Sequence, residues 1–151
     1  LLIMGVGDIK SDLEKKVKAL QLEDKIHFLG RLPFEEMMNK TKSAKLAISI
    51  DKATNGNYAI SLPNKIFEYI ACSVPVLVSP LQEIKLIVEK YETGEFLSSY
   101  NPQDLAKQIT NLLNNDIKLD LITENCKKAA KELCWENEET QIFKTIKQLE
   151  K

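Results

Sequence analysis

The sequence has few residues of the types that bind metals or act as nucleophiles. It contains one histidine, His27, and three cysteines, and no two cysteines form a Cys-x-x-Cys pair. A tetrahedral metal centre or a Ser-His-Asp triad needs more of these side chains than the chain offers. We therefore expect no metal site and no triad. Cys72, Cys126 and Cys134 are expected to be reduced thiols, as is usual in a cytoplasmic protein.

Long apolar runs and an excess of charge of one sign are also lacking. Apolar residues make up 44% of the chain, charged residues 28%, and the net charge is -1. No run approaches the roughly 20 residues of a membrane span, and no basic face argues for nucleic acid. The chain starts at Leu1 without an initiator methionine, so we expect a piece excised from a longer protein. No signal peptide is visible, and the protein is expected to be cytoplasmic.

Short apolar runs alternate with longer segments of helical periodicity, which is typical of an α/β domain with a parallel sheet. Right-handed crossovers then predict one doubly wound, Rossmann-like domain over residues 1–151. The predicted strands are 1–4, 26–29, 46–50, 74–78 and 94–97. The predicted helices begin near residues 11, 33, 63, 83, 102 and 119, the last with a break near residues 134–137.

Local signals predict how several of these segments begin. Residues 11–14 have the Ser-x-x-Glu pattern of a capping box. Asn101 followed by Pro102 is typical of a helix start, with asparagine as the cap. Residues 51–62 are polar and contain the turn signal of residues 55–57, so they are predicted to form a loop.

Ligands of doubly wound sheets bind beyond the carboxyl ends of the strands. Three loops fit that position: residues 5–8, 30–33 and 51–62. The first contains a Gly-x-Gly pair, but the third glycine of a dinucleotide fingerprint would fall at Lys10. A tight strand-to-helix turn is therefore the preferred interpretation of residues 5–8.

Asn64, Lys65 and Glu68 form the main candidate site, on the helix that follows the long loop. A lysine at a helix N-terminus opposes the helix dipole, which suggests that an anion binds there. Unsatisfied first-turn N–H groups can cradle a phosphate, with Lys65 as counter-charge. Glu68 offers two acceptors that suit the two hydroxyls of a ribose. The alternative is an ordinary surface helix with a Lys-Glu pair.

Residues 63–71, Pro-Asn-Lys-Ile-Phe-Glu-Tyr-Ile-Ala, followed by Pro-Val-Leu at 75–77, resemble a known motif. It is the nucleotide-sugar motif of family 4 (group 1) glycosyltransferases, of the polysaccharide-assembly type with Pro-Asn-Lys-x-Phe-Glu-Tyr. Residues 2–7, 26–32 and 134–136 are similar to other segments of that family in order and spacing. The resemblance implies the C-terminal, donor-binding half of a GT-B fold.

The resemblance also implies roles for individual residues. Glu68 would bind the ribose hydroxyls, and the enzyme would be retaining and metal-independent, with no cofactor besides its nucleotide diphosphate-sugar substrate. The catalytic residues stay unassigned. The remaining implied contacts are Gly30, Arg31 and Leu32 beside the base, and Ser61, Leu62, Asn64 and Lys65 facing the diphosphate or sugar.

The sequence departs from the family pattern at three places. Many relatives have a glutamate eight positions before the second one, where this chain has Ile60. Ser73 stands at a helix end that usually carries glycine, and a serine in a left-handed cap costs about 1 kcal/mol, so a different turn is an alternative there. The upstream Arg and Lys that grip the diphosphate in the family have no counterpart in the chain.

We therefore predict the nucleotide-sugar-binding domain of a glycosyltransferase of envelope or capsular polysaccharide assembly. It would lack its acceptor domain and the first strand of its own sheet, and would be inactive alone. The full-length enzyme would use a sugar or lipid-linked acceptor and could associate peripherally with the inner face of the membrane. No nucleic acid is expected as a partner.

Two alternatives stay open at this point. One is another GT-B enzyme, such as a sugar-nucleotide epimerase, although His27 is poorly placed for proton transfer. The other is a non-catalytic Rossmann-like interaction module. The apolar stripe of the last helix, which either packs on the sheet or is exposed for a partner, consists of Ile142, Phe143, Ile146 and Leu149.

Overall fold

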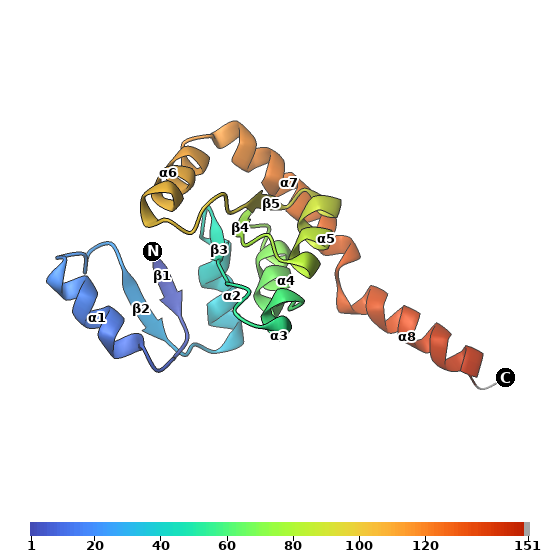
Figure 1. Cartoon of the computed structure of the whole chain (residues 1–151). Coiled ribbons are helices and arrows are strands. Elements are labelled where there is room, and N and C mark those ends of the chain that lie inside the picture. The colour runs from blue at the N-terminus through green and yellow to red at the C-terminus, as the bar shows by residue number, and fades with distance from the viewer. Residues whose placement is uncertain (150–151) are drawn as a thin grey trace. The chain divides into compact units, whose positions relative to one another are not determined.

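The structure is a computed structural model that describes residues 1–149. Its contacts divide the chain into two compact units, Leu1–Lys40 and a larger unit from Thr41 onward (Figure 1). Each unit is described by itself.

The first unit pairs two short parallel strands. Leu2 lies opposite His27 and Ile3 opposite Phe28, and the register then shifts so that Met4 pairs with Gly30. The elements of this unit are β1 (Leu2–Met4), α1 (Lys10–Ala19), β2 (His27–Gly30) and most of α2 (Phe34–Lys42).

Helix α1 starts one residue earlier than the sequence predicts. Ile9 is its N-cap and makes no side-chain capping bond. The N–H of Leu13 donates to the Ile9 carbonyl oxygen at 3.0 Å, which places Ser11 inside the first turn. A capping serine needs non-helical backbone angles, so the predicted capping box is wrong.

The second unit is built on three parallel strands in the order β3-β4-β5. Figure 1 shows these strands side by side, and α4 and α7 pack against each other. The strands are β3 (Ala47–Ser49), β4 (Val76–Val78) and β5 (Gly94–Phe96). The helices are α3 (Gly56–Ala59), α4 (Asn64–Ala71), α5 (Gln82–Tyr91), α6 (Pro102–Leu113), α7 (Asp116–Glu132) and α8 (Trp135–Leu149).

The core of the second unit surrounds the middle strand. All three residues of β4 are fully buried, as expected for a strand that is covered on both faces of a parallel sheet. Helix α4 contributes Ile66 and Ile70, one turn apart, and both are fully buried. Further fully buried side chains are Val74, Ile84, Val88, Thr93 and Cys126.

The strands and long helices predicted for this unit are present, although β4 begins two residues later than predicted. Asn101 caps α6 by accepting the N–H groups of Gln103 at 2.9 Å and Asp104 at 3.4 Å, as predicted. The predicted loop of residues 51–62 contains the short helix α3, because the Asn55 side chain caps it by accepting from the Tyr58 N–H at 3.0 Å. Helix α7 begins three residues before the predicted 119.

Ser73 keeps the left-handed conformation although it is not glycine. Its φ is 59°, and its N–H donates to the Ile70 carbonyl oxygen at 2.8 Å. The N–H of Val74 then reaches the Tyr69 carbonyl oxygen at 3.0 Å. These bonds close the end of α4 and turn the chain towards β4, so the left-handed cap is retained rather than replaced by another turn.

Helix α8 begins at Trp135, at the break that the sequence predicts. Figure 1 shows it as a helix that leads away from α7. None of its described residues is buried. The apolar stripe is exposed at Ile142, Phe143, Ile146 and Leu149.

Candidate functional site

The carboxyl ends of β3, β4 and β5 meet at one edge of the second unit's sheet. A polar residue lies at or after the end of each strand. Ser49 is the last residue of β3, Ser79 follows β4, and Tyr100 lies in the segment after β5. This is the edge where open parallel sheets bind ligands.

Asp51 connects these polar groups. Its Oδ2 atom accepts a hydrogen bond from the Ser49 hydroxyl at 3.1 Å and lies 3.2 Å from the Lys65 Nζ atom. The Tyr100 hydroxyl donates to the Asp51 carbonyl oxygen at 2.9 Å and lies 3.1 Å from the Ser79 hydroxyl. The loop after β3 is therefore tied to the ends of β4 and β5 and to the first turn of α4.

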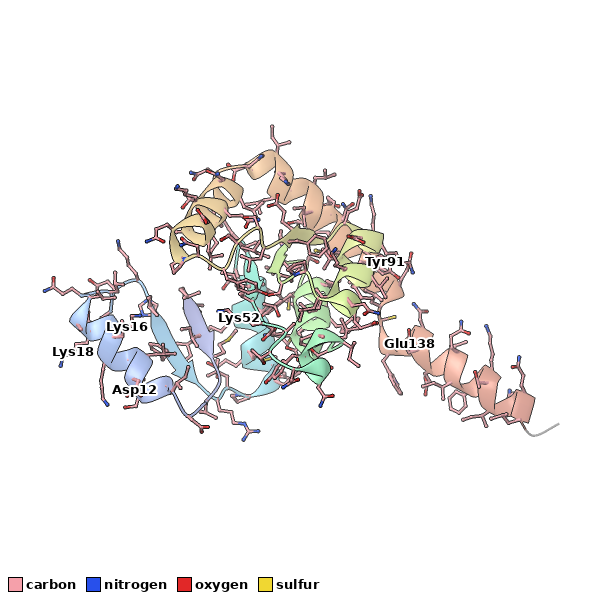
Figure 2. The ribbon with its side chains drawn as sticks, viewed as in Figure 1. Asp12, Lys16, Lys18, Lys52, Tyr91 and Glu138 are labelled. Atoms are coloured by element: carbon pink, nitrogen blue, oxygen red, sulfur yellow. The ribbon has the colours of Figure 1, made fainter. Side chains whose placement is uncertain are left out.

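A second cation stands in the same loop. Lys52 is labelled in Figure 2. Its Nζ atom lies 5.3 Å from the centroid of the Tyr100 ring, a cation–π distance. The ring thus contacts Lys52 while its hydroxyl contacts Asp51. Lys65 therefore pairs with the Asp51 carboxylate, while Lys52 adds a second positive charge over the Tyr100 ring.

The first two turns of helix α4 contain three of the predicted site residues. Pro63 is the N-cap, and it makes no side-chain capping bond. The helix starts with exposed Asn64 and half-buried Lys65, and half-buried Glu68 follows one turn later. The helix therefore offers backbone donors, an amide, an ammonium and a carboxylate within two turns, which suits an anion next to a diol.

The electrostatic environment of Tyr69 includes two carboxylates. Burial raises the pKa of the Tyr69 phenol, and the negative charges of Glu68 and Asp51 raise this pKa further. The long-range partner Asp51 and the helix residue Glu68 therefore act on the same side chain. Lys65 adds a positive charge through its ion pair with Asp51, so groups of both charge signs lie on or beside α4.

The loop before α4 is held by its own hydrogen bonds. The Ser61 hydroxyl donates to the Tyr58 carbonyl oxygen at 3.1 Å, and Leu62 is half-buried. Ile60 occupies the position of the missing glutamate, ends α3 as its C-cap and is exposed. Ser61 and Leu62 thus lie in the connection from α3 to α4.

The remaining residues of the predicted binding site belong to the first unit. Gly30 ends β2 with a φ of 68°, which favours glycine, and its carbonyl oxygen accepts from the Gly5 N–H at 2.7 Å. Arg31 is exposed and Leu32 is half-buried. The structure therefore brings Gly30, Arg31 and Leu32 together with one another, and separately assembles residues 61–68 in the second unit.

Sequence reasoning missed the residues that organise this edge. The sequence places Asp51 at the start of a predicted loop, and no motif singles out Tyr100. Tyr100 is 49 positions from Asp51, so no local pattern links them. The usable signal is positional, because Ser49 and Ser79 lie within one residue of the end of a predicted strand and Tyr100 lies three residues beyond one.

A hollow of about 530 Å³ lies elsewhere on the second unit. None of the predicted site residues lines it. Glu95 and Lys118 form an ion pair in its wall, and the Gln108 side chain donates to the Phe96 carbonyl oxygen at 2.8 Å. We place the candidate site at the strand edge rather than in this hollow, because the edge combines cations with first-turn backbone donors.

The described residues offer neither a metal centre nor a membrane-spanning helix. They contain no group of three or more His, Cys, Asp or Glu side chains that could hold a metal ion. None of the described helices has both the length and the apolarity needed to cross a membrane.

Several known proteins resemble this chain. A curated chitobiosyldiphosphodolichol beta-mannosyltransferase from Debaryomyces hansenii is 29% identical over 143 residues, which covers 90% of this chain and 29% of that protein. The chain spans roughly a third of the length of the curated relatives it matches.

Two solved structures show the same fold. Sucrose-phosphate synthase from Thermosynechococcus elongatus has a TM-score of 0.79 at 22% identity, over 99% of this chain and 38% of that one. Anabaena HepE in complex with UDP-glucose has a TM-score of 0.78 at 20% identity, over 97% of this chain and 40% of that one. The predicted α/β, Rossmann-like fold with parallel strands is thereby confirmed.

The resemblance to the group 1 glycosyltransferases is confirmed at the level of the family. The family model described as glycosyl transferases group 1 matches residues 1–132. That range contains β1 to β5 and the candidate site on α4. The chain therefore belongs to the group 1 glycosyl transferases.

Proposed function

We propose that this chain is the nucleotide-sugar-binding domain of a glycosyltransferase, equivalent to the C-terminal half of a GT-B enzyme. The observation that carries the proposal is that Lys65 and Glu68 both lie on the first two turns of α4, within a chain of the group 1 family. The HepE structures, which contain UDP or UDP-glucose, support a nucleotide-sugar as the ligand class.

Each part of α4 has a role in this proposal. The first-turn N–H groups, Asn64 and Lys65 hold the diphosphate, because a helix N-terminus and an ammonium both favour negative charge. Glu68 accepts hydrogen bonds from the two ribose hydroxyls. Ser61 and Leu62 face the diphosphate or sugar, and Gly30, Arg31 and Leu32 flank the base.

The chemistry proposed for the whole enzyme follows from these groups. A metal-independent transferase must stabilise the departing diphosphate with cations and backbone dipoles, and Lys65 and the α4 N-terminus are positioned for that role. Retention of anomeric configuration is proposed from the family resemblance, and the anomeric form of the product tests it. The chain alone is expected to be inactive, because transfer needs an acceptor held opposite the donor.

The wider setting is proposed from the same resemblance. The whole enzyme would take part in envelope or capsular polysaccharide assembly in the cytoplasm, with a sugar or lipid-linked acceptor. Peripheral association with the inner face of the membrane would then belong to the full-length enzyme.

A calorimetric titration with UDP, GDP, ADP and CMP tests the proposal. One nucleotide should bind selectively, and its 2′-deoxy form should bind more weakly because Glu68 loses one donor. Glu68→Gln should weaken binding of the ribonucleotide by about tenfold or more, the range for hydrogen bonds to a charged group. The variant should also bind the ribo and deoxy forms with more similar affinity.

Glu83→Gln is the matched control, since Glu83 lies in the first turn of a different helix, α5. It should leave nucleotide affinity unchanged. Absence of binding by every nucleotide, together with self-association of the chain, would contradict the proposal and favour an interaction module.

A further inference from the structure

We propose that Asp51 is a positioning residue that holds the Lys65 ammonium and competes for it with the phosphates of the donor. This inference rests on the proposed function. Asp51 belongs to the loop after β3 and not to the α4 motif. Its carboxylate would set how strongly an anionic ligand binds at the start of α4.

Asp51 is fixed on two sides. The Ser49 hydroxyl donates to its Oδ2 atom at 3.1 Å, and the Tyr100 hydroxyl donates to its carbonyl oxygen at 2.9 Å. Its side chain is 27% exposed. A carboxylate held in this way is a preorganised partner for a flexible lysine side chain, whose four-carbon stem can turn towards either of two anions.

Lys65 is in an unfavourable position without a counter-charge. It lies in the first turn of α4, where the helix dipole repels a cation. Asp51, 3.2 Å from the Lys65 Nζ atom, supplies that counter-charge. The pair therefore stabilises the chain before a ligand binds, and the same carboxylate becomes a competitor when a ligand arrives.

A diphosphate can win this competition. It brings more negative charge than one carboxylate, and it also accepts from the α4 N–H groups. The Lys65 side chain is 38% exposed, so its ammonium can move from Asp51 to the ligand. Asp51 should therefore weaken the binding of phosphorylated ligands and leave an uncharged nucleoside unaffected.

The substitution Asp51→Asn isolates this effect. The amide keeps the size of the side chain and can still accept from Ser49, and the bond from Tyr100 is made to the backbone. A partly exposed ion pair of this kind corresponds to about a two- to fivefold change in affinity. Asp51→Asn should therefore tighten UDP and pyrophosphate binding by about two- to fivefold and leave uridine binding unchanged.

A double-mutant cycle with Lys65→Gln separates competition from simple repulsion. If Asp51 acts through Lys65, Asp51→Asn no longer raises the affinity for UDP and pyrophosphate in the Lys65→Gln background. The control is Glu124→Gln, which also removes a carboxylate paired with a lysine, at 2.6 Å from Lys127. Glu124 precedes Asn125, whose side chain contacts the Glu92 carbonyl oxygen before β5, at the opposite edge of the sheet.

The outcomes are distinct. An equal gain in the Lys65→Gln background, or no gain in UDP and pyrophosphate binding, overturns the role of Asp51. If no nucleotide binds but Asp51→Asn tightens pyrophosphate binding through Lys65, the proposed function fails while the role of Asp51 stands. If nucleotides bind with the expected dependence on Glu68 and Asp51→Asn has no effect, the role of Asp51 fails while the proposed function stands.

Discussion

Gly94 of β5 lies directly opposite Val76 of β4 in the parallel ladder. A Cβ atom added at Gly94 would overlap the Val76 carbonyl oxygen and its Cγ2 atom. The two strands can approach this closely because Gly94 has no side chain. The requirement is steric, since the backbone of Gly94 is not in the left-handed region.

Gly94→Ala should therefore destabilise the second unit. The added methyl group must displace backbone as well as a side chain, and overpacking of this kind costs about 1–3 kcal/mol or more. Urea unfolding monitored by circular dichroism measures the loss. Gly56→Ala is the matched control, because nothing lies within 4 Å of a Cβ at Gly56, and its stability should stay equal or rise slightly. Equal stability of the two variants would contradict the steric role of Gly94.

Ser73→Gly should stabilise the same unit. The residue has a φ of 59°, and the left-handed conformation costs a non-glycine residue about 1–2 kcal/mol. The greater freedom of glycine in the unfolded chain offsets part of that, so we expect a gain of about 0.5–1 kcal/mol in urea unfolding. Ala106→Gly, in the middle of α6, should instead lower the free energy of unfolding by about 1 kcal/mol. A loss for Ser73→Gly would mean that the serine side chain contributes to the cap.

The stability of the second unit should fall in alkaline solution because of Cys126. Burial raises the pKa of its thiol to about 12, above its ordinary value of 9.0. The unfolded chain then loses this proton first, so the contribution is complete below pH 9 and is lost as pH rises from 9 towards 12. The free energy of unfolding should fall by up to about 1.4 kcal/mol per pH unit in that window.

Cys126→Ala provides the comparison for this pH dependence. It removes the titrating group but keeps the tyrosines and lysines that also titrate in alkaline solution. The variant will be less stable at every pH because of the lost packing. The informative quantity is therefore the slope of the free energy of unfolding against pH. Equal slopes for the two proteins above pH 9 would show that Cys126 is not the group responsible.

Trp135 should emit like a tryptophan in water. It is the chain's single tryptophan, starts α8, and is 65% exposed. Its fluorescence maximum should therefore shift little on unfolding, and iodide should quench it in the folded chain. A blue-shifted maximum that depends on protein concentration would instead mean that a second copy covers the apolar stripe of α8.

The sequence predicted most elements of the fold because the second unit follows simple patterns. The continuous apolar run at β4 and the Asn101-Pro102 start of α6 are local signals, and both were confirmed. The start of α1 was wrong because Ser11 has a cap-like sequence but a helical backbone. Helix α3 was missed because its length of four residues gives no periodicity to detect.

The candidate site was only partly predictable. Lys65 and Glu68 fall within one motif on one helix, so a single sequence window contains them. Asp51 and Tyr100 come from separate loops, and the sheet topology alone brings them together. Their roles depend on hydrogen bonds across 49 positions, which a single sequence cannot specify.

The buried thiol of Cys126 and the polar cluster of Asp51 lie at opposite ends of the sheet. The Cys126 Sγ atom is 3.6 Å from the carbonyl oxygens of Val74 and Thr93, just before β4 and β5. Asp51 and Tyr100 follow the strands at the other end. Mutations near Asp51 can therefore accumulate with little effect on packing around Cys126. Over evolutionary time, we expect such a scaffold to acquire new ligand preferences while its folding stability is maintained.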